Sequence, residues 1–198
     1  GGDGIFFIPL NGKENVPAND SSETLILFSD TVIGDIINDS LQPDFSFVRK
    51  SVAILKGKEP VDSNIHFYWA KENERPATMF IPKIANVIPT DTYWNGDGFV
   101  NTATDSSINF FAFLIRQTKY GLGFTEAANA MIKIDKNSNP PYISYKQTQT
   151  PFFIKPSADT AYDYGSYGSG IFVNTKMAGV PNPDGYIYVY RSEEHTSE

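Results

Sequence analysis

Cysteine is absent from the 198 residues of this chain, and histidine occurs only twice. The first absence excludes disulfide bonds, thiolate zinc sites and cysteine nucleophiles. The scarcity of histidine leaves only His66 and His195 to serve in a Ser-His-Asp triad. Any catalysis by this chain must therefore depend on carboxylates, hydroxyls, phenols or amines.

Basic residues are also few, and no apolar run is long. Lys and Arg number 16 against 23 Asp and Glu, which gives a net charge of -7. That charge has the wrong sign for gripping a phosphate backbone, so we do not expect nucleic acid as a partner. The longest apolar runs, such as 108–115, fall far short of the roughly 20 residues of a membrane-spanning helix. No membrane span is expected, and these features leave the oligomeric state open.

The two ends of the sequence carry signals of their own. The chain opens on Gly1-Gly2-Asp3-Gly4, without the basic and apolar stretches of a signal peptide, so we expect any such peptide to lie upstream. Residues 191–198 match the translation of a common sequencing-adapter oligonucleotide in one reading frame. We interpret them as an artefact, and the alternative is a natural polar tail. Without them His66 is the one histidine, which we interpret as structural.

The composition favours strands and turns. Aromatic residues make up 14% of the chain, beside 15 Gly and 13 Pro, a mixture typical of short strands joined by tight turns. The runs 5–10 and 24–28 are short and rich in β-formers, and 186–190 alternates strictly between Tyr and aliphatic residues. One window, 126–131, has a helical pattern, although it could equally enter a strand. We predict an all-β chain.

A glycine motif recurs ahead of apolar strands, in the segments 2–4, 96–98 and 168–170. Each motif leads into one apolar strand and is followed by a second. After the motifs at 2–4 and 96–98, two further strand-like runs bring the number of strands to four, which is the number in a β-propeller blade. We predict one partial domain over 1–190, with blade one at about 1–70, a linker at about 71–92, blade two at about 93–155 and the start of blade three at about 160–190. The alternative is a β-sandwich in which the glycines only mark turns.

Several short motifs along the chain resemble a bacterial domain-of-unknown-function family that looks like the five-bladed propeller glycosidases of the arabinanase, levansucrase and invertase type. They are Gly2-Asp3-Gly4, Leu27-Phe28-Ser29-Asp30-Thr31, Arg49-Lys50-Ser51-Val52-Ala53 and Tyr93-Trp94-Asn95-Gly96-Asp97-Gly98. The resemblance implies an incomplete five-bladed β-propeller of about two and a half four-stranded antiparallel blades, working outside the cytoplasm in the periplasm, at the cell surface or as a secreted protein. Ser29 and Lys50 depart from the residues expected at their positions.

Acidic residues at the heads of inner strands suit sugar chemistry. Glycoside hydrolysis commonly uses two carboxyl groups, about 5.5 Å or about 6.5–9.5 Å apart, and a propeller directs its inner strands to one channel. The resemblance implies that Asp3 is the general base or nucleophile and Asp97 a pKa-tuning or substrate-binding group, with Asp30 nearby. The alternative for each is a turn cap.

The general acid is harder to find. The resemblance implies a carboxylic acid on the third blade, where Asp163 is the nearest candidate; Glu126 falls in the second. Trp94 and Tyr93 are candidate platforms for sugar rings, and Arg49 is a further candidate substrate-binding residue.

The sequence therefore leaves two alternative functions open. One is a domain that binds and hydrolyses a polysaccharide or oligosaccharide, and the other is a non-catalytic carbohydrate-binding or scaffold propeller. No cofactor is required by either. A calcium ion held by Asp3, Asp30 and Asp97 is left open, because carboxylate oxygens suit that ion.

Overall fold

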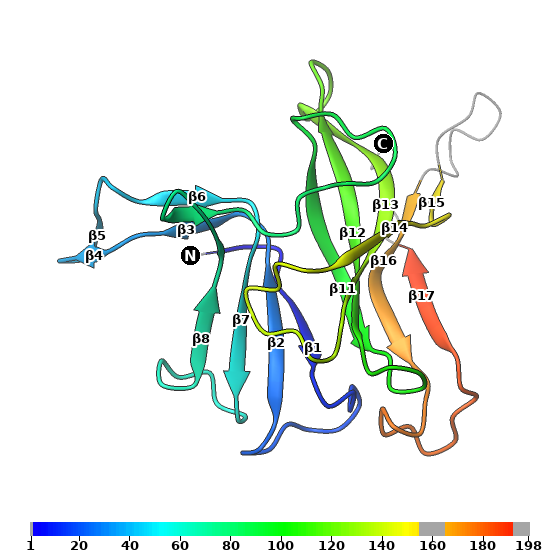
Figure 1. The fold of residues 1–198 in the computed structure, drawn as a ribbon. Coiled ribbons are helices and arrows are strands. Elements are labelled where there is room, and N and C mark those ends of the chain that lie inside the picture. The colour runs from blue at the N-terminus through cyan, green and yellow to red at the C-terminus, as the bar shows by residue number, and fades with distance from the viewer. Residues whose placement is uncertain (1, 155–164, 192–198) are drawn as a thin grey trace, which may run out of the picture.

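The computed structural model describes residues 2–154 and 165–191, and these form strands and turns without a helix (Figure 1). The all-β prediction is confirmed. The window 126–131 lies inside strand β13 (Phe124–Ile134), which pairs with a strand on each side. Pairing with two neighbours therefore overrides its local helical pattern. This part of the chain also holds no helix long and apolar enough to cross a membrane.

The first sheet has four antiparallel strands in the order β1 (Phe6–Pro9), β2 (Glu23–Phe28), β7 (Ser51–Lys56) and β8 (Ile65–Tyr68). Both faces are apolar. Leu25 and Leu27 belong to the main core, whereas Ile26 between them points to the other face, as alternation along a strand requires.

The second sheet repeats this order with longer strands. It consists of β11 (Thr92–Val100), β12 (Ile108–Gln117), β13 and β14 (Lys146–Gln149), all antiparallel. A third sheet follows with β15 (Phe153–Ile154), β16 (Gly165–Val173) and β17 (Ile187–Arg191). The two short strands after β13 thus go to different sheets, because β14 joins the second sheet and β15 the third.

The first long strands of the three sheets pack side by side, since β1 contacts β11 and β11 contacts β16. Glycines permit the close approach. A Cβ on Gly98 would lie 2.4 Å from Ile8 Cδ1, and one on Gly96 would lie 2.5 Å from the Gly168 carbonyl oxygen. The recurring glycine motifs at 96–98 and 168–170 therefore have a packing role.

The main core fills the space between the first and second sheets. Each fully buried aliphatic or aromatic side chain there contributes about 1.5–3 kcal/mol by leaving water. Fully or nearly fully buried members from both sheets are Ile8, Leu25, Leu27, Val52, Phe110, Leu114, Ile132 and Ile134.

Two hairpins extend from these sheets. A long arm pairs β3 (Thr31–Ile33) with β6 (Ser46–Val48) and, at its tip, β4 (Ile36–Ile37) with β5 (Ser40–Leu41), and it projects away from the sheets (Figure 1). A short hairpin of β9 (Ala70–Glu72) and β10 (Arg75–Ala77) lies where the sequence predicted the beginning of a linker.

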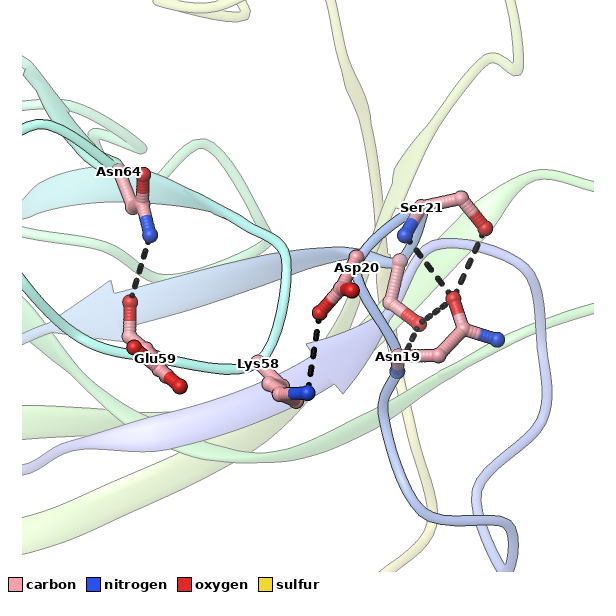
Figure 2. A network of polar contacts seen from close by, with 7 residues as sticks. Asn19, Asp20, Ser21, Lys58, Glu59 and Asn64 are labelled. Carbon is pink, nitrogen blue, oxygen red and sulfur yellow. Dashed lines mark hydrogen bonds and ion pairs between the residues drawn. The ribbon is translucent and has the colours of Figure 1, made fainter.

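The loops at one end of the first sheet are held by polar contacts (Figure 2). Asn19 Oδ1 accepts hydrogen bonds from the Ser21 N–H and Oγ–H, and Lys58 Nζ lies 3.1 Å from Asp20 Oδ1. These contacts join the loop before β2 to the loop after β7 and are exposed to solvent.

Candidate functional site

A cleft of about 500 Å³ opens where β2 ends and β11 begins. Its walls come from strands of the second and third sheets and from the loops beside the first sheet. It is lined by Asp3, Gly4, Ser29, Asp30, Trp94, Asn95, Phe113, Ile115, Leu122, Phe124, Thr125, Glu126, Gly165 and Ser166. Segments far apart in the sequence thus meet in one hollow.

Asp3 and Asp30 lie in the loops beside the first sheet and line the cleft, and we call these two residues the acidic wall. The Asp3 N–H donates to the Asp30 carbonyl oxygen at 3.2 Å, and the Ser29 N–H donates to the Asp3 carbonyl oxygen at 2.8 Å. These backbone bonds hold the main chains of the two aspartates side by side. Arg49 Nη1 lies 3.7 Å from Asp30 Oδ1 as an ion pair. Three of the predicted site residues, Asp3, Asp30 and Arg49, are therefore brought together.

An aromatic pair and a third carboxyl group stand on the second sheet. Trp94 and Phe124 meet edge to face with ring centroids 4.7 Å apart, and both line the cleft. Glu126, on β13, lines it too. The sequence places Glu126 in the second unit, whereas the resemblance implies a general acid in the third. The missed signal is its position two residues after an aromatic residue at the start of a long strand.

Asn95 supplies an unused donor. This side chain lines the cleft and is buried, and its Nδ2 has no hydrogen-bond partner among the described residues. Buried amides are nearly always hydrogen-bonded, so an unpaired one in a cleft wall is ready to meet a polar ligand atom.

Lys50 follows Arg49 in the chain and is 1% exposed. Its Nζ donates to the Arg49 carbonyl oxygen at 2.8 Å. Burial lowers the pKa of Lys50 to about 8, while the charges of Asp30 and Asp3 oppose the fall. The sequence showed Lys50 only as a departure from a motif; nothing in its local pattern indicated burial beside two acids.

Asp97 does not join the cleft. It lies within an irregularity of β11, between Asn95 and Gly98, where its Oδ1 accepts from the Gly98 N–H at 2.8 Å and its Oδ2 from the Ile171 N–H at 3.0 Å. Burial raises the pKa of Asp97, and those two bonds oppose the rise. The side chain therefore ties β11 to β16. Asp3 and Asp97 therefore hold different places, because Asp3 lies before a strand and Asp97 within one.

A second half-buried acid lies near Asp97. Burial, with the nearby charge of Asp97, raises the pKa of Glu14 to about 8. Glu14 Oε1 is buried with no hydrogen-bond partner among the described residues. The next residue, Asn15, donates from its N–H to Ala178 O at 2.8 Å and from Nδ2 to Val173 O at 3.3 Å. We call Glu14 and Asp97 the junction carboxyls, because they lie where the three sheets meet.

The remaining residues considered from the sequence lie outside the cleft or outside the described residues. Tyr93 is 1% exposed and packs in the main core, where its hydroxyl donates to Gln147 Oε1 at 2.9 Å. Because its ring is enclosed by the core and its hydroxyl is already bonded, Tyr93 offers no platform to a ligand. Asp163 lies outside the described residues, and His66 is exposed on β8.

Within the described ranges no group of three or more His, Cys, Asp or Glu side chains could hold a metal ion. The calcium set considered from the sequence is divided, because Asp3 and Asp30 line the cleft and Asp97 does not. The cleft itself can accept hydrogen bonds at Asp3, Asp30 and Glu126, and it can pack a flat apolar surface against Trp94.

Comparison with known proteins gives a fold relationship. No family model matches the chain, and no curated protein matches its sequence. The family resemblance drawn from the motifs therefore stays a prediction. A solved structure from Bacteroides ovatus, provisionally described as a hydrolase, superposes with a TM-score of 0.60 at 15% identity. The match covers 98% of this chain and 46% of the other, so the chain spans about half the length of that protein. This likeness shows a shared all-β fold.

Proposed function

We propose that this chain is part of a glycosidase-like β-propeller whose cleft binds a polysaccharide or oligosaccharide and hydrolyses it. The observation that carries the proposal is the meeting of Asp3 and Asp30 with Glu126, Trp94 and the unpaired Asn95 amide in one cleft. The hydrolase description of the Bacteroides ovatus protein is consistent with it.

The chemistry of a sugar fits these walls. The C–H face of a pyranose or furanose ring packs on an indole, and its hydroxyls donate to carboxylates and accept from amides. Trp94 and Phe124 supply the flat surface, and Asp3, Asp30 and Asn95 supply the polar partners. A volume of about 500 Å³ lies within the usual range of ligand clefts.

Catalytic roles follow from position. Asp3 stays the proposed general base or nucleophile, and Asp30, ion-paired with Arg49, orients the substrate. Glu126 projects from the second sheet into the same cleft and takes the role of general acid that the sequence could not fill. Asp97 has no part in the chemistry, because both of its carboxylate oxygens accept backbone hydrogen bonds at the sheet junction.

The three sheets are proposed as successive blades of the propeller, with the predicted boundaries shifted to the observed strands. The uncovered outer faces support this. On the first sheet, Phe7 and Phe67 are 56% and 55% exposed, in one row with Ile26 and Ala53. On the third sheet, Phe172 pairs with Tyr188 on an exposed face. Further blades would cover both. Because polysaccharides occur mainly outside cells, we also propose an extracytoplasmic location.

Binding and cleavage can be tested together. In a Trp69→Phe background, Trp94 is the sole tryptophan, and its fluorescence is titrated with arabinan, levan, xylan and pectin oligosaccharides while new reducing ends are counted. We expect one class to change the fluorescence, and we expect Asp3→Asn and Glu126→Gln to abolish cleavage while binding persists. Asp20→Asn, remote from the cleft, is the matched control.

Two other outcomes are informative. Binding without any cleavage by the wild-type chain, or by a longer protein that contains it, favours the non-catalytic carbohydrate-binding module. A fluorescence response that Asn95→Ala and Asp30→Asn leave unchanged contradicts a role for this cleft.

A further inference from the structure

Lys50 is an unusual residue to find inside the molecule. It stands between β6 and β7 and is 1% exposed, although lysine is almost never fully buried unless it is paired. Its backbone carbonyl oxygen accepts from the Met79 N–H at 3.2 Å, which fixes its main chain against the segment 78–80. That segment carries no ionisable side chain. Lys50 Nζ has one hydrogen bond given above, to Arg49 O, so its burial needs an electrostatic explanation.

The charges that face Lys50 belong to the acidic wall. Asp30 and Asp3 are the negative groups that act on its ammonium, and Arg49 is the positive one. Together with Lys50 they make two negative and two positive groups behind and along one side of the cleft. With a pKa of about 8, the lysine carries its charge at neutral pH, and the set is then neutral.

Of the two cations, Lys50 is the better fixed. The Arg49 side chain is 42% exposed, and its guanidinium lies 3.7 Å from Asp30 Oδ1, a geometry that gives a weak and salt-screened pair. Asp30 Oδ1 is buried and has no hydrogen-bond donor among the described residues. The orientation of Asp30 therefore depends on charge rather than on hydrogen bonds, and the buried ammonium of Lys50 is the charge that solvent screens least.

Packing alone does not account for a lysine here. A buried ion pair is a poor source of stability, since an apolar side chain of similar volume often stabilises a fold as well or better. The feature that remains is a buried positive charge, next in the chain to the residue that pairs with Asp30, which acts on two cleft carboxylates.

We propose that Lys50 is a positioning residue of the cleft, whose buried ammonium group is the internal counter-charge of Asp30 and Asp3. This proposal rests on the proposed function in one respect, which is that the cleft is the site where the ligand binds. While Lys50 is protonated, the acidic wall is neutralised and Asp30 is held in place. When Lys50 loses its proton, the wall becomes net negative and the alignment of Asp30 is lost, so binding and cleavage of a neutral glycan would fall above neutral pH.

The charge of the cleft can be measured without any glycan. Trp94 lines the cleft, and in a Trp69→Phe background it reports ions that enter, through quenching by caesium, iodide and neutral acrylamide. Glu14→Gln is added because Glu14 is a second group with a pKa of about 8. The measurements are made at constant low ionic strength, where screening is small.

We expect quenching by caesium to rise about twofold, and quenching by iodide to fall correspondingly, with a midpoint near pH 8. Acrylamide quenching, which reports access alone, should not change. Lys50→Met should show the high-pH behaviour already at pH 7, and Lys50→Arg should retain the neutral-pH behaviour across the range. A merely structural role would alter acrylamide access or leave all three quenchers unaffected.

The result that overturns the proposal is a caesium quenching constant without a step between pH 7 and 9. If Lys50→Met fails to fold, the pH titration of caesium quenching in the protein that keeps Lys50 is sufficient to test the proposal. Asp30→Asn provides a second route: it should lower the pKa of Lys50, followed by NMR of ¹³Cε-labelled lysine, and an unchanged value contradicts the pairing. Because neither measurement uses a sugar, each can fail while glycan binding succeeds, and the reverse.

Discussion

The cleft wall and the sheet junction both hold acidic residues, yet the two regions treat them in opposite ways. Asp3 and Asp30 lie at strand ends, line a cleft and face the cations Arg49 and Lys50. The junction carboxyls are half-buried near each other, and burial raises the pKa values of both. The same Gly-Asp-Gly pattern thus has two roles. Before a strand it exposes a carboxylate, and within a strand its carboxylate joins two sheets.

The largest expected effect concerns the glycines of the junction. Gly98→Ala would place a Cβ 2.4 Å from Ile8 Cδ1 and 2.6 Å from the Asn109 carbonyl oxygen, so β1 and β11 must separate. We expect the free energy of unfolding to fall by about 3 kcal/mol in urea denaturation. Gly121→Ala is the control: it has a positive φ but no neighbour within 4 Å, and it should cost about 1 kcal/mol. Equal losses would contradict the packing role.

The next largest effect is the difference in stability between variants of Asp97 and Asp3. Asp97→Ala leaves the N–H groups of Gly98 and Ile171 without acceptors inside the protein, which should cost about 2–3 kcal/mol. Asp3→Ala removes an exposed side chain and should change stability by less than about 0.5 kcal/mol. The same denaturation series measures both. A destabilisation by Asp3→Ala as large as that by Asp97→Ala would remove the distinction between the regions.

The junction should also respond to pH. Because the folded pKa of Glu14 is about 8 and its ordinary value is 4.5, the folded state binds more protons than the unfolded state between these values. The free energy of unfolding should therefore fall as the pH rises through this window, by up to about 1.4 kcal/mol per pH unit. Glu14→Gln removes most of that slope and should be more stable than wild type at pH 8. Asp97, whose pKa is raised too, leaves a residual slope of the same sign. Parallel pH profiles for the two proteins would show that Glu14 is not buried as described.

The smallest effect belongs to a third kind of acid, at the solvent-exposed loops of Figure 2. Asp20 pairs with Lys58 at 3.1 Å, but the Asp20 side chain is 88% exposed. Asp20→Asn should change the free energy of unfolding by less than about 0.5 kcal/mol, and added salt should erase the difference. A larger or salt-resistant effect would mean that exposure is a poor guide to which carboxylates matter.

The sequence supports some of this picture and not the rest. Short apolar runs such as 24–28 were enough to predict strands, because alternation and β-branched residues act locally. Asp3, Asp30, Arg49 and Trp94 were also predicted as site residues, and they lie in or beside one cleft. The roles of Lys50, Glu14 and Asp97 depend on which distant strands pack against them, and Tyr93 and Trp94 differ only in the face to which the pleat directs them. Such information resides in long-range pairing and in the irregularity of β11, which no local pattern encodes.

The most direct test of the account is a map of where a sugar binds. With an oligosaccharide that changes Trp94 fluorescence, backbone ¹⁵N–¹H shifts are followed for cleft residues such as Asn95, Thr125 and Ser166 and for junction residues such as Gly98, Ile171 and Ala178. We expect saturable shifts at the first set and little change at the second. Shifts that centre on the junction, or on neither set, would contradict sugar binding in the cleft.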